Sequence, residues 1–224
     1  MAMENVMQEA IKDKRTVEVV AGGSLAEGVA GSGAVVLSIV GLAGVMAPFM
    51  VAIATILAGL ALVLEGGALG VRFPSLARET AHGRLGVMEL GGGMSAEVLG
   101  GIGGIVLGIL ALLGVHPMTL VPIAAIAFGG TLLLGAGATA RLNDLQIERA
   151  CDEKETRHVA RAAVRSAEGM QVLAGVGSGV LGILALTGYD PMILGLVAML
   201  SVGISDLMSG TAISGRMLSA LHCS

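Results

Sequence analysis

The stretch EVLGGIGGIVLGILALLGVHPM, Glu97 to Met118, decides the fold because the chain uses it more than once. It returns 74 residues later as QVLAGVGSGVLGILALTGYDPM, Gln171 to Met192, with 14 of 22 positions identical. A fainter copy, EGVAGSGAVVLSIVGLAGVMAPF, occupies Glu27 to Phe49. Each copy is an apolar run that ends in a glycine and then a proline, which is typical of a helix followed by a tight turn.

The composition indicates a membrane protein. Hydrophobic residues make up 54% of the chain and charged residues 13%, whereas a soluble domain has about 25% charged residues. The N-terminal sequence MAMENVMQEAIKDKRTVEVV lacks the apolar core of a cleaved signal peptide, so we expect the first membrane helix to direct insertion. Cys151 and Cys223 lie far apart in polar segments, which argues against a disulfide framework.

Six apolar runs are long enough to cross roughly 30 Å of hydrocarbon at about 1.5 Å per residue. All 13 Lys and Arg residues lie outside the tight turns at 45–48, 115–118 and 188–191. The positive-inside rule therefore places both termini and both long linkers in the cytoplasm. The predicted fold is an all-α polytopic membrane protein with six transmembrane helices, arranged as three tandem antiparallel hairpin repeats, in a bacterial-type inner membrane. A pseudo-threefold and a linear array of hairpins both remain possible arrangements.

The sequence divides into seven segments on this interpretation. Three are the hairpins, two are cytoplasmic linkers (the second expected to be helical), and the others are an amphipathic N-terminal segment and a short C-terminal tail. Their boundaries are 1–26 for the N-terminal segment, 27–72 for hairpin 1, 73–96 for the first linker, 97–140 for hairpin 2, 141–168 for the second linker, 169–216 for hairpin 3 and 217–224 for the tail.

Small residues recur at every fourth position of each hairpin's first helix. Such spacing lets membrane helices pack closely, because lipid tails leave no hydrophobic driving force for association. We expect these first helices to form the inner layer and the second helices the outer one; the alternative is that the small residues line a lumen or a lipid-binding groove. The predicted helix-packing residues are Ala30, Ala34, Ser38, Gly100, Gly104, Gly108, Ala174, Ser178 and Gly182.

Glu27, Glu97 and Glu168 each follow an alanine just before the first helix of a hairpin. A carboxylate at this position stabilises the positive end of the helix dipole and its free N–H groups. The alternative is a ring of three carboxylates that attracts cations to a cytoplasmic mouth. Glu168 aligns one turn away from the other two, which weakens the ring hypothesis.

Two further acids lie inside apolar runs. Glu65 is seven residues before Arg72 and can either reach the cytoplasmic interface or pair with a neighbouring arginine, whereas Asp206 is deeper. An unpaired charge near the middle of a membrane costs roughly 2.5–3.5 kcal/mol on insertion scales, so such a residue normally faces the interior and has a function. Asp206 is therefore a candidate proton or cation site; alternatively it is a protonated acid that is hydrogen-bonded to its surroundings, with Ser205 and Ser209 as nearby partners.

The residues point to no catalytic chemistry. The chain has no P-loop, dinucleotide fingerprint, haem-attachment motif or hydrolase triad, so we expect neither an enzyme nor a cofactor. Four scattered histidines and two cysteines do not make a metal site. The linkers mix both signs of charge, which does not favour nucleic-acid binding.

Two functions remain. The first is a self-associating scaffold or the membrane anchor of a larger complex, with linkers 73–96 and 141–168 as docking surface for a cytoplasmic protein. The near absence of aromatic residues, which normally form a belt at the lipid interface, favours contacts with other protein and hence a homo-oligomer in the lipid bilayer. The second is a small proton- or cation-coupled transporter or channel that uses Asp206, with Glu65 as a second candidate residue.

Overall fold

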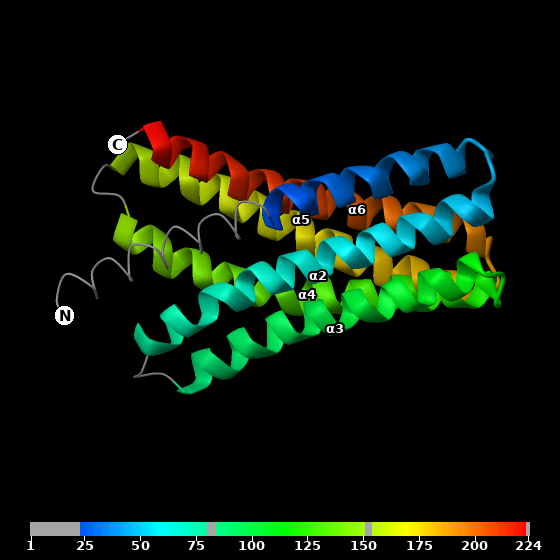
Figure 1. Cartoon of the computed structure of the whole chain (residues 1–224), viewed down its shortest axis with the longest axis horizontal. Coiled ribbons are helices and arrows are strands. Elements are labelled where there is room, and N and C mark those ends of the chain that lie inside the picture. The colour runs from blue at the N-terminus through cyan, green and yellow to red at the C-terminus, as the bar shows by residue number, and fades with distance from the viewer. Residues whose placement is uncertain (1–22, 80–83, 151–153, 223–224) are drawn as a thin grey trace, which may run out of the picture.

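The structure is a computed structural model that describes residues 23–79, 84–150 and 154–222, with side chains described over 23–68, 95–137 and 169–210. This part of the chain is helical and contains six helices long and apolar enough to cross a membrane, as an all-α membrane protein requires. They form one elongated bundle (Figure 1). The helices are Gly23–Leu42, here called the N-terminal helix, α2 (Ala47–Glu79), α3 (Arg84–Leu112), α4 (Pro117–Ala150), α5 (Lys154–Leu186) and α6 (Pro191–His222).

The helices continue beyond their apolar spans at one end of the bundle. The apolar span of α2 ends at Ala68, but the helix runs on to Glu79, and α3 begins at Arg84. In the same way α4 continues to Ala150 and α5 begins at Lys154. The segments 73–96 and 141–168 therefore fall largely within helices that extend the membrane spans (Figure 1).

The other end of the bundle carries three tight turns, whose glycines adopt a left-handed backbone. Just beyond the end of α3, for example, Gly114 has φ +83° and the N–H of Val115 donates to the carbonyl of Leu110 at 3.0 Å. This is the hydrogen-bond pattern of a Schellman cap, which ends a helix where glycine takes positive φ without a steric cost. Gly44 and Gly188 take the same conformation, with φ +86° and +98°.

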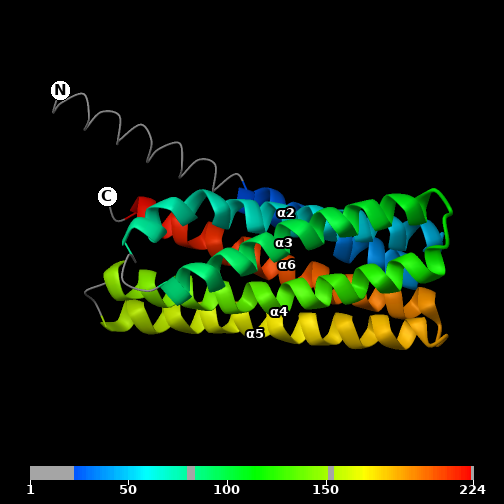
Figure 2. The same ribbon diagram turned by 90° about the horizontal axis from the view of Figure 1, so that it is seen from below.

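Contrary to the sequence-based expectation, the second helix of each hairpin forms the inner layer. Helices α2, α4 and α6 contact one another, whereas α3 and α5 do not. In their apolar spans, 44, 56 and 44% of the residues of α2, α4 and α6 are buried, against 33, 28 and 33% for the N-terminal helix, α3 and α5. Figure 2 shows the outer helix α5 alongside the inner helix α4. The prediction was wrong because small residues allow close approach but do not decide which helix is central.

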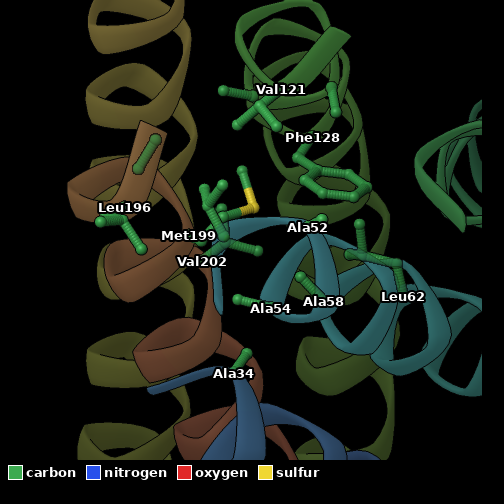
Figure 3. Close-up of a cluster of buried hydrophobic side chains, with 14 of the residues drawn as sticks. Ala34, Ala52, Ala54, Ala58, Leu62, Val121, Phe128, Leu196, Met199 and Val202 are labelled. Carbon is green, nitrogen blue, oxygen red and sulfur yellow. The ribbon is translucent and has the colours of Figure 1, made fainter. Parts of the chain in front are cut away.

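The apolar core lies among the three inner helices. Its large, fully buried side chains come from α2, α4 and α6 and point toward one another (Figure 3). Alanines fill the positions between them, so the inner helices lie close together. The core includes Leu62, Phe128, Leu132, Leu196, Met199 and Val202, with Ala52, Ala54, Ala58, Ala124, Ala125 and Ala198.

Glycines make the closest contacts between the layers. A Cβ built at Gly59 of α2 would lie 2.7 Å from the carbonyl oxygen of Gly101 in α3, which is closer than a real Cβ can approach. The corresponding distance from Gly129 of α4 to the oxygen of Gly175 in α5 is 2.5 Å. From Gly31 of the N-terminal helix to the oxygen of Gly203 in α6 it is 2.9 Å. Each inner helix is thus joined to the outer helix of a different hairpin, and the third contact closes the circle.

Candidate functional site

A group of polar residues lies inside the bundle near the end opposite the tight turns. Each helix contributes one position, and α6 adds Asp206 about one turn closer to the tight turns. Glu65 is 18 residues from the start of α2, about 27 Å along the helix axis, and still inside the apolar span. We call this group the polar layer: Glu27, Glu65, Glu97, Gly135, Gln171, Asp206 and Ser209.

The four acids of the polar layer are buried. Glu27, Glu65, Glu97 and Asp206 expose 1, 3, 0 and 1% of their surface. They come from four helices, yet the charges of Glu27 and Glu97 each lie near enough to interact with those of Glu65 and Asp206. The fold therefore gathers acids that are up to 179 positions apart in the chain into one electrostatically connected group.

Glu65 is the hydrogen-bonded member of the group. The Nε2 amide of Gln171 donates to its Oε1 at 3.2 Å, and the Ser209 hydroxyl donates to the same oxygen at 2.8 Å. Ser209 also lies beside Glu27, but a hydroxyl has one proton to donate and this one goes to Glu65. These two bonds connect α2 with α5 and α6 across the bundle.

The other three acids have no such partner. Both carboxylate oxygens of Glu27, Glu97 and Asp206 are buried and accept no hydrogen bond from the described residues. The three ranges whose side chains are described contain no Lys or Arg, and their single histidine, His116, lies at a tight turn. Among the described side chains, therefore, no basic group balances these three acids.

Glycines on neighbouring helices make room for two of these acids. A Cβ at Gly135 of α4 would overlap the carboxylate of Glu97, so α4 contributes space where the other helices contribute a polar side chain. A Cβ at Gly31 would lie 3.0 Å from the Cβ of Asp206, at the contact between the N-terminal helix and α6. A side chain at either glycine would have to displace the acid or separate the helices.

The structure brings together residues that the sequence suggested for two separate sites. The sequence suggested Glu27 and Glu97 as part of a carboxylate ring at a cytoplasmic mouth, and Glu65 and Asp206 as a proton or cation site. All four belong to the polar layer. The side chain of Glu168 lies outside the described residues. The prediction that Ser209 serves Asp206 was wrong, because its hydroxyl donates to Glu65.

Sequence reasoning missed Gln171 and Gly135, although the repeat spacing contained the signal. Positions 27, 97 and 171 are separated by 70 and 74 residues, and so are positions 65, 135 and 209. Applying the spacing to Glu27 and Glu97 leads to Gln171, not to Glu168. Applied to Glu65, it leads to Gly135 and Ser209.

The predicted small-residue ladder faces the inner helices. Ala30, Ala34, Ser38, Ala174 and Ser178 are buried. Within α3, a Cβ at Gly104 would overlap the ring of Phe128, and one at Gly100 would overlap Thr131.

The remaining members of the ladder also contact the inner helices. Gly108 lies against Ile56 and Gly182 against Ile126. The Ser178 hydroxyl donates to the Ala125 carbonyl at 2.8 Å. The row one residue further along, Gly31, Gly101 and Gly175, was missed and lies against the backbone of the inner helices.

Among the described residues, no group of three or more His, Cys, Asp and Glu side chains is placed to hold a metal ion. Comparison of the chain with family models, with curated proteins and with solved structures finds no match. The polar layer is therefore interpreted from its own chemistry.

Proposed function

We propose that this protein is a small proton- or cation-coupled transporter or channel whose binding site is the polar layer. One observation carries the proposal: three fully buried acids, Glu27, Glu97 and Asp206, have neither a hydrogen-bond donor nor a basic residue among the described side chains. Intramembrane acids are costly and normally mark ion or proton pathways. Binding and release of protons or cations would offset the cost and give these acids a role.

The position of the site supports access from one side. Toward the tight turns, the space among the inner helices is filled by Leu62, Phe128, Leu132 and Met199, all with no exposed surface. In the other direction α2 leaves its apolar span three residues beyond Glu65 and continues as a polar helix. We infer that this conformation is closed toward the turns and that cations enter from the polar end.

The proposed topology has three tandem hairpins about a pseudo-threefold axis, with both termini in the cytoplasm of a bacterial-type inner membrane. The glycine contacts support the repeats, because Gly31, Gly101 and Gly175, and likewise their partners, follow the spacing of 70 and 74 residues. The absence of Lys and Arg from the three tight turns supports the orientation. The site would then open toward the cytoplasm.

Ion flux tests the proposal. The purified protein in liposomes should carry a proton or alkali-cation flux when a concentration gradient is applied, and Asp206→Asn should reduce it at least about tenfold, because the neutral amide takes up no exchangeable charge. Asp190→Asn, which removes an exposed carboxylate at a tight turn, is the matched control and should leave the flux unchanged. Equal flux through wild type and Asp206→Asn would contradict the proposal.

Self-association, as a scaffold or anchor with a partner on linkers 73–96 and 141–168, is a second proposal. The outer helices favour it, since Gly103 of α3 and Gly177 of α5 have open space where a side chain would be. Such positions let a second copy approach closely. We expect the purified protein in detergent to have the mass of more than one chain. The Gly103→Leu variant should have the mass of a single chain. A monomeric wild type would exclude the scaffold without affecting the transport proposal.

A further inference from the structure

The polar layer offers a ligand many acceptors and few donors among its described side chains. Glu27, Glu97 and Asp206 present six buried oxygen atoms without a hydrogen-bond partner. The Ser209 hydroxyl and one N–H of the Gln171 amide donate to a single oxygen of Glu65, which leaves the second N–H of Gln171 as the remaining side-chain donor of these two residues. A molecule bound here must therefore bring its own donors as well as positive charge.

The acids are distributed around the interior rather than directed at one point. They stand on the N-terminal helix, α2, α3 and α6, and within the described part of the chain no three of them are placed as ligands of one metal ion. A compact ion would therefore meet only part of the negative charge. A ligand with separated cationic centres would meet more of it.

The side chains that border the polar layer on the side of the tight turns are apolar. Leu62 and Leu132 are fully buried, and by the repeat spacing they occupy the same level of α2 and α4 as Asp206 does in α6. Phe128, also fully buried, follows one turn further out on α4. A ligand reaching from Asp206 toward the other acids would thus pass a hydrocarbon surface, which suits methylene groups between charged ends.

We propose, on the basis of the transport function above, that the polar layer binds an organic cation with two or more ammonium groups joined by methylene chains. Each ammonium group carries three N–H donors for the unpartnered oxygens. No covalent bond changes: each ammonium group that enters replaces one carboxylic-acid proton, which is released to solution, so the buried site stays near neutral. The ligand is therefore exchanged for protons.

Proton release measures this exchange directly. The full-length protein in detergent, in weakly buffered solution near neutral pH with an indicator dye, is titrated with 1,4-diaminobutane. We expect saturable release of more than one proton per chain, and at least about tenfold weaker binding in Asp206→Asn and in Glu97→Gln, since each variant loses a charge-assisted contact. Asp190→Asn should bind the diamine as the wild type does, and Asp206→Glu should still release protons. Melting temperatures should confirm that all variants are folded.

Three outcomes would overturn the inference. If butylamine, with one ammonium group, binds as tightly as the diamine, the site does not recognise separated charges. If potassium, magnesium or manganese ions release protons and the diamine does not, the ligand is an inorganic ion, while the proposed transport function stands. If no cation releases protons and Asp206→Asn carries wild-type flux, both the inference and the proposed function fail.

Discussion

At the scale of single residues, the site depends on which acids have donors. Glu65 receives two hydrogen bonds on one oxygen, while Glu27, Glu97 and Asp206 receive none from the described residues. Gln171 and Ser209 thus fix one oxygen of the Glu65 carboxyl group, while its second oxygen, like both oxygens of the other three acids, is buried without a partner. This arrangement follows from side-chain geometry that no single stretch of sequence contains.

Gln171 tests the role of Glu65. Gln171→Leu removes a buried donor and should lower the free energy of unfolding by about 0.5–2 kcal/mol, the range for interhelical hydrogen bonds in membranes. It should also change the ion flux, because Glu65 loses one of its two donors. Thermal denaturation in detergent and liposome flux measure the two effects.

Ser178→Ala is the matched control for that experiment. It removes a buried interhelical hydrogen bond of similar kind, from the Ser178 hydroxyl to the Ala125 carbonyl, outside the polar layer. It should lower stability by a similar amount and leave the flux unchanged. If both variants alter the flux equally, the donors of Glu65 have no special part in transport.

At the scale of helices, the repeats were readable from sequence but the layers were not. The identity between 97–118 and 171–192 predicts equivalent helices, and the glycine and proline after each run predict the turns. The central helices are those that carry the large buried side chains Leu62, Phe128 and Met199. The sequence does not reveal this, because hydrophobicity alone does not distinguish a side chain buried in protein from one that faces lipid. The acids were identified individually, but their meeting in one layer required the positions of all six helices.

Gly104 tests the packing between layers. Gly104→Leu places a side chain where the ring of Phe128 lies and should destabilise the bundle by about 1–3 kcal/mol or prevent folding. Leu133→Ile, at a position with 42% of its surface exposed, should have little effect. Thermal denaturation and recovery from the membrane measure both.

A second variant keeps that prediction decisive if Gly104→Leu does not fold. The double variant Gly104→Leu with Phe128→Ala makes room for the new side chain and should recover part of the lost stability. If Gly104→Leu alone is as stable as the wild type, the small residues of α3 do not set the distance between the layers.

At the scale of the whole molecule, the bundle encloses four acidic side chains within six helices that are otherwise apolar in their spans. The circle of glycine contacts brings the six helices close together around the polar layer, and the apolar core fills the interior on the side of the tight turns. The described spans contribute no Lys or Arg to balance the acids. The proposed function depends on what balances these acids, and we propose that protons do so when no ligand is bound.

Infrared difference spectroscopy of the purified, ligand-free protein tests this central claim most directly, because protonated carboxyl groups absorb at a carbonyl frequency separate from that of carboxylates. We predict a protonated-carboxyl signal at neutral pH that weakens stepwise in Glu27→Gln, Glu97→Gln and Asp206→Asn and is smallest in the triple variant, which keeps only Glu65 of the four buried acids. Asp190→Asn should leave it intact. A wild-type protein without that signal, or a triple variant that keeps it in full, would contradict the claim that these three acids obtain their counter-charge from outside the protein.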